Sequence, residues 1–152
     1  MPTLKRIQFS VTIAAPASVV WHHITTADSY RIWTSAFAEG SYFEGSWEPG
    51  AKILFLAPSG DGMVSEIAES RQDAFISIRH RGFIAKGVED TDSAMVRAWL
   101  PAYENYTLVP VAEGTRMVVD QEVAAEWEEH LAAAWPKALE LLGGLCVQSG
   151  GA

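Results

Sequence analysis

Alternating hydrophobic and polar residues predict a series of strands along most of the chain. The clearest case is residues 7–13, where Ile, Phe, Val and Ile alternate with Gln, Ser and Thr, the two-residue period of a half-buried strand. Turn residues such as Asp61-Gly62 separate similar segments and indicate hairpins. The predicted strands are residues 7–13, 51–57, 63–70, 75–81, 104–109 and 115–123, and the glycine-rich stretch 40–50 suits further short, bent strands.

Two short helices are predicted directly after the first strand. Pro16 suits a first helical turn, because the amide hydrogen it lacks has no partner there, and Val20 and Ile24 begin an apolar face behind it. A second helix is expected from Asp28, a suitable N-cap residue. Residues 87–98, in contrast, combine an acidic run with a few apolar residues and are expected to form a loop with a short helical turn capped by Ser93.

A long helix, Trp127 to Cys146, is predicted near the end of the chain. Apolar residues recur at spacings of three and four on one face, at Trp127, Leu131, Trp135, Ala138, Leu142 and Leu145. Pro136 lies inside this segment and should kink it, since proline removes a backbone hydrogen bond. We expect Gly143-Gly144 to fray the end of the helix and residues 149–152 to be disordered.

Length and charge limit the classes of function. A chain of 152 residues suits one domain, residues 1–152. The 19 acidic and 11 basic residues give a net charge of -8, which disfavours nucleic acid as a partner because both are anionic. Cys146 is the only cysteine, and the first residues lack the apolar segment of a signal peptide. No apolar stretch reaches the ~18 residues of a membrane span, so a cytoplasmic location is expected.

Several motifs go beyond these general patterns. Residues 15–21 (APASVVW), followed by Ile32-Trp33-Thr34 and Phe37, are similar to the N-terminal signature of the START-like superfamily, also called SRPBCC. Residues 45–50 (GSWEPG), residues 104–108 (ENYTL), Gly114-Thr115 and Trp135-Pro136 with Ala138-Leu139 and Leu142 resemble its branch related to the activator of the ninety-kilodalton heat-shock chaperone's ATPase. The resemblance spans nearly the whole chain.

The resemblance implies a fold more directly than a function. It implies an α+β, helix-grip architecture, in which a curved antiparallel sheet of six to seven strands wraps around one long C-terminal helix, with two short helices after the first strand. Superfamily members include lipid and hormone binders, polyketide cyclases, oxygenase domains and co-chaperones, and a fold does not determine an activity. Family members often dimerise, so a homodimer is an expected state.

A curved sheet that grips one helix usually leaves an interior too wide for side chains to fill. An apolar cavity with a few polar groups is suited to a small ligand, although each aromatic side chain here could instead simply pack in the core. The predicted lining residues are Trp33, Phe37, Phe55, Met63, Ile78, His80, Trp99, Tyr106, Trp135 and Leu139.

Polar residues on apolar faces are the candidates for chemistry. His80 shares strand parity with Ile76 and Ile78, and Glu104 shares parity with Tyr106. If they met, His80, Glu104 and Tyr106 could transfer protons, but a histidine that merely satisfies its hydrogen bonds is the alternative.

The sequence contains no pattern typical of a metal site or of the common hydrolase and nucleotide-binding motifs. The adjacent His22-His23 point about 100° apart on a helix and cannot share a metal, and residues 89–92 lack the glycine and terminal glutamate of a calcium loop. No metal and no cofactor is predicted, and the nucleophile elbow, P-loop and dinucleotide fingerprint are absent from the sequence.

Three functions remain open. The first is non-catalytic binding of a small apolar or amphipathic molecule, lipid-like or polyketide-like, in the cavity. The second is a cyclase or dehydratase acting on a polyketide-like substrate through His80, Glu104 or Tyr106. The third is a co-chaperone that acts through surface contacts, which only the family resemblance suggests.

Overall fold

The computed structural model describes residues 4–150, and within them eight strands form one antiparallel sheet. Each strand pairs with its neighbours in antiparallel register, and β1 pairs with β8 although they lie at opposite ends of the chain. In spatial order the strands are β1 (Leu4–Ile13), β8 (Gly114–Ala124), β7 (Ala102–Val111), β5 (Phe75–Ala85), β4 (Gly62–Arg71), β3 (Lys52–Leu56) and β2 (Tyr42–Gly45), and β6 (Val88–Asp90) pairs with β5 outside this order.

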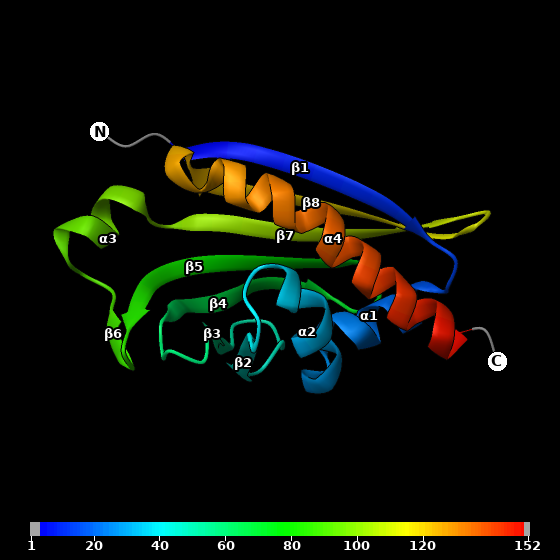
Figure 1. Cartoon of the computed structure of the whole chain (residues 1–152), viewed down its shortest axis with the longest axis horizontal. Coiled ribbons are helices and arrows are strands. Elements are labelled where there is room, and N and C mark those ends of the chain that lie inside the picture. The colour runs from blue at the N-terminus through cyan, green and yellow to red at the C-terminus, as the bar shows by residue number, and fades with distance from the viewer. Residues whose placement is uncertain (1–3, 151–152) are drawn as a thin grey trace.

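The helices gather on one face of this sheet (Figure 1). The long helix α4 (Ala125–Gly150) packs against β1 and against both short helices, α1 (Ala17–Thr25) and α2 (Ala27–Trp33). A 3-10 turn η1 (Thr34–Ala36) continues from α2, and α3 (Ala94–Trp99) lies at the other end of the sheet. The predicted helix-grip class, with two short helices after the first strand, is confirmed.

Three local expectations need correction. The segment Val88–Asp90 was expected in a loop but pairs with β5 as β6, which raises the strand number within residues 4–150 above the predicted six to seven. Helix α4 also does not fray at Gly143-Gly144 but continues to Gly150. Leu142 and Cys146 are fully buried on either side of these glycines, so packing outweighs the low helix propensity of glycine. The tail expected to be disordered is therefore helical at residues 149–150, and its last two positions lie outside the described residues.

The sheet opens at the end that carries α3. β5 pairs with β7 only from Phe75 to His80, opposite Thr107 to Ala102. Beyond His80, β5 continues to Ala85 and pairs with β6, while the chain reaches β7 through α3. Figure 1 shows β5 and β7 diverging toward α3. This divergence gives access to the interior beneath the N-terminal half of α4. None of the helices within residues 4–150 is long and apolar enough to cross a membrane.

Candidate functional site

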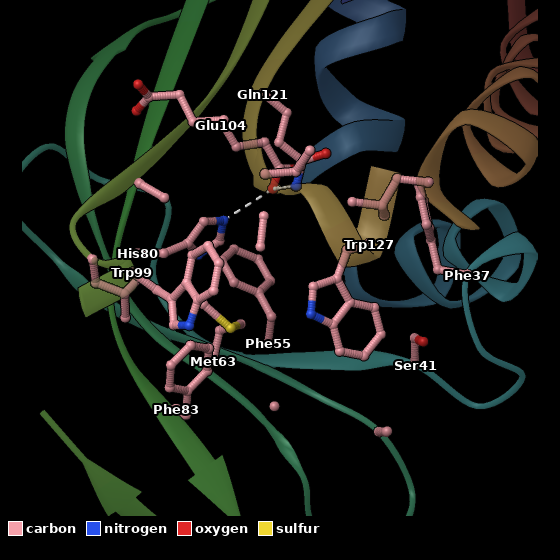
Figure 2. Close-up of a pocket in the computed structure, with 18 of the residues that line it drawn as sticks. Phe37, Ser41, Phe55, Met63, His80, Phe83, Trp99, Glu104, Gln121 and Trp127 are labelled. Atoms are coloured by element: carbon pink, nitrogen blue, oxygen red, sulfur yellow. Dashed lines mark hydrogen bonds and ion pairs between the residues drawn. The ribbon is translucent and has the colours of Figure 1, made fainter. Parts of the chain in front are cut away.

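A cavity of about 780 Å³ lies between the open end of the sheet and the N-terminal half of α4 (Figure 2). This volume lies within the range of roughly 300–1,000 Å³ that is usual for small-molecule sites. Met95 on α3 and Trp127 on α4 both line it and are 55% and 57% exposed. These two side chains therefore belong to its mouth, and the buried Trp33 and Trp135 belong to its inner wall.

Most of the side chains predicted to line a cavity do so. Ile78 and Leu139 are the two that do not: they are 1% and 2% exposed in the hydrophobic core and do not contribute to the cavity wall. Ile78 shares its face of β5 with His80 but lies deeper in the sheet, where β5 and β7 are still paired. The predicted residues that line the cavity are Trp33, Phe37, Phe55, Met63, His80, Trp99, Tyr106 and Trp135.

A chain of hydrogen bonds crosses four strands at the inner wall, and we call it the polar row: Ser65, His80, Glu104, Gln121 and Trp135. Ser65 Oγ lies 2.7 Å from His80 Nδ1, and His80 Nε2 lies 3.0 Å from Glu104 Oε1. Gln121 Nε2 donates to Glu104 Oε1 at 3.1 Å, and Trp135 Nε1 donates to Gln121 Oε1 at 2.9 Å. Pairing across the sheet places Ser65 opposite His80 and Glu104 opposite Gln121, so strand register builds the row.

The indole of Trp135 fixes the direction of these bonds. An indole N–H can only donate, so the Gln121 carbonyl oxygen must face it and the Gln121 amide nitrogen must face Glu104. The Glu104 carboxylate also accepts from the Tyr106 hydroxyl. His80 Nε2 is then the donor toward Glu104, which leaves Nδ1 to accept from Ser65 when the ring is neutral. Glu104 is thus a carboxylate supported by three donors.

Two tyrosine hydroxyls lie in the electrostatic field of this carboxylate. Burial raises the pKa of Tyr106 well above its ordinary value, and the nearby negative charge of Glu104 raises it further. The pKa of Tyr30 is raised by the same two causes, in the same order. Both tyrosines are therefore neutral at physiological pH and can donate a hydrogen bond. Tyr30 lines the cavity, is 8% exposed, and its hydroxyl has no hydrogen-bond partner among the described residues.

Sequence reasoning missed most of the residues that line the cavity, and four residues of the site show why. Gln121 occupies a position that alternation reserves for apolar residues, since Met117, Val119 and Val123 have the same parity, and this exception could have identified it. Tyr30 precedes Trp33 by three residues on α2 and so shares its face. Ser65 shares parity with Met63 and Ile67 on β4, so a polar residue among apolar ones could have identified it as well. The exposed Trp127 was placed on the helix face but not at a cavity mouth.

Other residues that could carry chemistry, such as Cys146 and His23, do not line this cavity. No group of His, Cys, Asp or Glu side chains within the described part of the chain has a metal-binding arrangement. Cys146 lies on the buried face of α4, and burial raises the pKa of its thiol to about 12. His23 is buried away from the cavity and pairs with Ser29 at 2.6 Å. The cavity chemistry therefore rests on the polar row and the two tyrosines.

Searches against family models and against curated proteins gave no match. Solved structures do match over most of the chain. Protein MLL2253 from Mesorhizobium loti has a TM-score of 0.74 and 16% identity, with 95% of this chain and 98% of that chain covered. The Aha1 dimer from Colwellia psychrerythraea has a TM-score of 0.66 and 16% identity, with 96% of each chain covered.

A third similar structure is larger than this chain. DynU16, from the dynemicin biosynthetic locus, has a TM-score of 0.67 and 18% identity, and the match covers 96% of this chain but 48% of DynU16. At identities this low, the likeness to these structures establishes a common fold alone. The chain therefore shares its helix-grip fold with these solved structures, an Aha1 protein among them.

Proposed function

We propose that this protein binds a small amphipathic molecule in the cavity beneath α4. The observation that carries the proposal is the combination of one accessible cavity of about 780 Å³ with a polar cluster at its inner wall. The mouth and sides are mainly aromatic and aliphatic, which suits an apolar body. Glu104, Tyr106 and Tyr30 would hydrogen-bond the polar end of the ligand.

Binding is tested by native mass spectrometry of the purified protein, followed by thermal melting with lipid-like and aromatic polyketide-like compounds. A ligand that binds only the folded state raises the melting temperature, by an amount that corresponds to about 2.7 kcal/mol at a hundredfold excess over Kd. Filling the cavity entrance with Ser41→Trp should abolish the shift, since Ser41 lines the cavity and is only partly buried. Ser35→Trp, on the exposed surface outside the cavity, is the matched control. No shift with any compound would contradict the proposal.

A second function, proton transfer on a bound substrate, is favoured by the meeting of His80, Glu104 and Tyr106 in one hydrogen-bonded cluster. The cluster lines the cavity, so a ligand group could reach it directly. A dehydratase would release one water from its substrate, and a binding protein would return the compound unchanged. A cyclase could rearrange its substrate without a change of mass, so chromatography together with mass analysis of the compound before and after incubation separates the two functions, and His80→Gln should abolish any conversion while retaining binding.

The co-chaperone function receives no comparable support from the site. The likeness to an Aha1 protein concerns the fold, and the cavity described above has no role in a surface contact. Binding in the cavity therefore remains the function we propose.

A further inference from the structure

The residues that line the cavity include carboxylates but no lysine or arginine among the described residues. Asp61, Glu104, Glu122 and Glu126 contribute these carboxylates. His80 is the single histidine among the described lining residues. The formal charges among the described lining residues, His80 aside, are therefore all negative.

Glu104 is the most deeply buried of these acidic side chains, and no lysine or arginine pairs with it within the described residues. Glu122 accepts from the Tyr103 amide at 2.9 Å and lies 3.7 Å from the Arg6 guanidinium. Asp61 accepts from the Lys86 amide at 2.9 Å, and Glu126 is exposed to solvent. The Glu104 side chain is only 13% exposed, and its ion-pair partner among the described residues is His80. Burying a carboxylate without a permanent cation is costly, so a cationic group beside Glu104 would stabilise it.

The Tyr30 hydroxyl is the second, independent observation. It lines the same cavity at 8% exposure without a hydrogen-bond partner in the described part of the chain. Buried polar groups are nearly always paired, by the protein itself or by a bound molecule. The Tyr30 ring stacks on Phe55 at 6.0 Å between centroids, and Phe55 lies 6.0 Å from His80 edge to face. Carboxylate, phenol and aromatic faces together are the groups that recognise an organic cation.

We propose that the ligand is an amphiphile whose polar end is a protonated amine, held between the Glu104 carboxylate and the Tyr30 hydroxyl. This inference rests on the binding function proposed above and narrows its ligand class. The ammonium hydrogens would donate to the free lone pairs of Glu104 and Tyr30, and the apolar body would extend along the aromatic walls toward Trp127. A fatty acid would place a second carboxylate beside Glu104, with no lysine or arginine in the lining to separate the two charges.

The test compares decylamine, decanol and decanoate, which share one alkyl chain and differ in the charge of the polar end. Binding to the full chain at neutral pH is followed by calorimetry and by tryptophan fluorescence, since Trp33, Trp99, Trp127 and Trp135 line the cavity. We expect decylamine to bind at least about tenfold more tightly than decanol, the factor that a hydrogen bond to a charged group contributes, and decanoate to bind most weakly.

The outcomes separate this inference from the function on which it rests. Equal binding of decylamine and decanol, or tighter binding of decanoate, would overturn the amine specificity and leave cavity binding intact. Failure of all three compounds to bind would overturn both proposals. Because these measurements use the unaltered protein, they remain decisive even where a variant does not fold.

Single substitutions then test which residues cause the preference for decylamine. Glu104→Gln keeps the size of the side chain and should reduce decylamine binding about tenfold or more while decanol binding is retained, which also reports that the cavity is intact. Tyr30→Phe should cause a smaller loss for decylamine. Glu129→Gln, an identical change on the exposed side of α4 outside the cavity, is the matched control and should change neither. An unchanged preference for decylamine in Glu104→Gln would overturn the assignment of Glu104 as its partner.

Discussion

At the scale of single residues, Trp135 joins the core to the cavity. It is 1% exposed, packs against Phe37 with 4.8 Å between ring centroids, and holds Gln121 through its indole N–H. Trp135→Ala should therefore lower the free energy of unfolding by about 3–5 kcal/mol, as other buried large-to-small aromatic changes do. Trp127→Ala removes the same ring from an exposed position and should cost at most about 0.5 kcal/mol. Urea unfolding measures both, and similar losses would contradict the assignment of Trp135 to the core and Trp127 to the mouth.

The two buried tyrosines predict a loss of stability at alkaline pH. Their pKa values are raised in the folded protein, first by burial and then by Glu104. Above a pH of about 10 the unfolded chain releases these protons and the folded chain keeps them, so the free energy of unfolding falls as pH rises. The slope should be about 1.4 kcal/mol per pH unit for each tyrosine. Tyr30→Phe and Tyr106→Phe should each remove one such contribution from urea unfolding curves recorded across this pH range, and an unchanged slope in both variants would contradict it.

At the scale of elements, the glycines of α4 are sites where the helix can be stabilised. Gly144 is exposed, and a Cβ added there would meet nothing within 4 Å, whereas one on Gly143 would meet Ile13 at 3.8 Å, an ordinary contact. Gly144→Ala should raise the free energy of unfolding by about 0.5–1 kcal/mol because alanine has the higher helix propensity. Gly62→Ala is the contrasting change, since its Cβ would lie 1.9 Å from the Phe55 carbonyl oxygen, and it should destabilise the β3–β4 hairpin. Thermal melting compares the two variants, and destabilisation by Gly144→Ala would contradict the prediction.

The same elements show what the sequence could and could not predict. Alternation identified β1 and the face of β5 that carries His80, because both strands bury one side. Parity also placed Glu104 and Tyr106 on one face, but their meeting with His80 depends on the register between β5 and β7, which no local pattern encodes. The contact of Ser65 with His80 was missed for a related reason, since it depends on a register shift between β4 and β5 that leaves Arg81 of β5 out of the strand pairing. β6 was missed because its three residues are exposed or only partly buried and have no burial pattern to detect.

At the scale of the whole molecule, the net charge of -8 acts on a cationic ligand before it reaches the cavity. A negative field attracts an organic cation and raises its association rate, and salt screens this attraction over a Debye length of about 30 Å at 0.01 M and 8 Å at 0.15 M. The association rate constant of decylamine should therefore fall several-fold between these salt concentrations, whereas that of uncharged decanol should stay nearly constant.

Dissociation should respond differently, because the Glu104 carboxylate is buried and salt screens buried pairs much less than exposed ones. Stopped-flow tryptophan fluorescence gives both rate constants from one titration. Glu129→Gln removes a surface charge far from the contact and should lower only the association rate, and only slightly, while Glu104→Gln should mainly accelerate dissociation. If salt changed only the dissociation rate, the assignment of the ligand to Glu104 would be contradicted. Such a result would place the bound cation at an exposed acidic residue such as Glu126 rather than at the buried carboxylate.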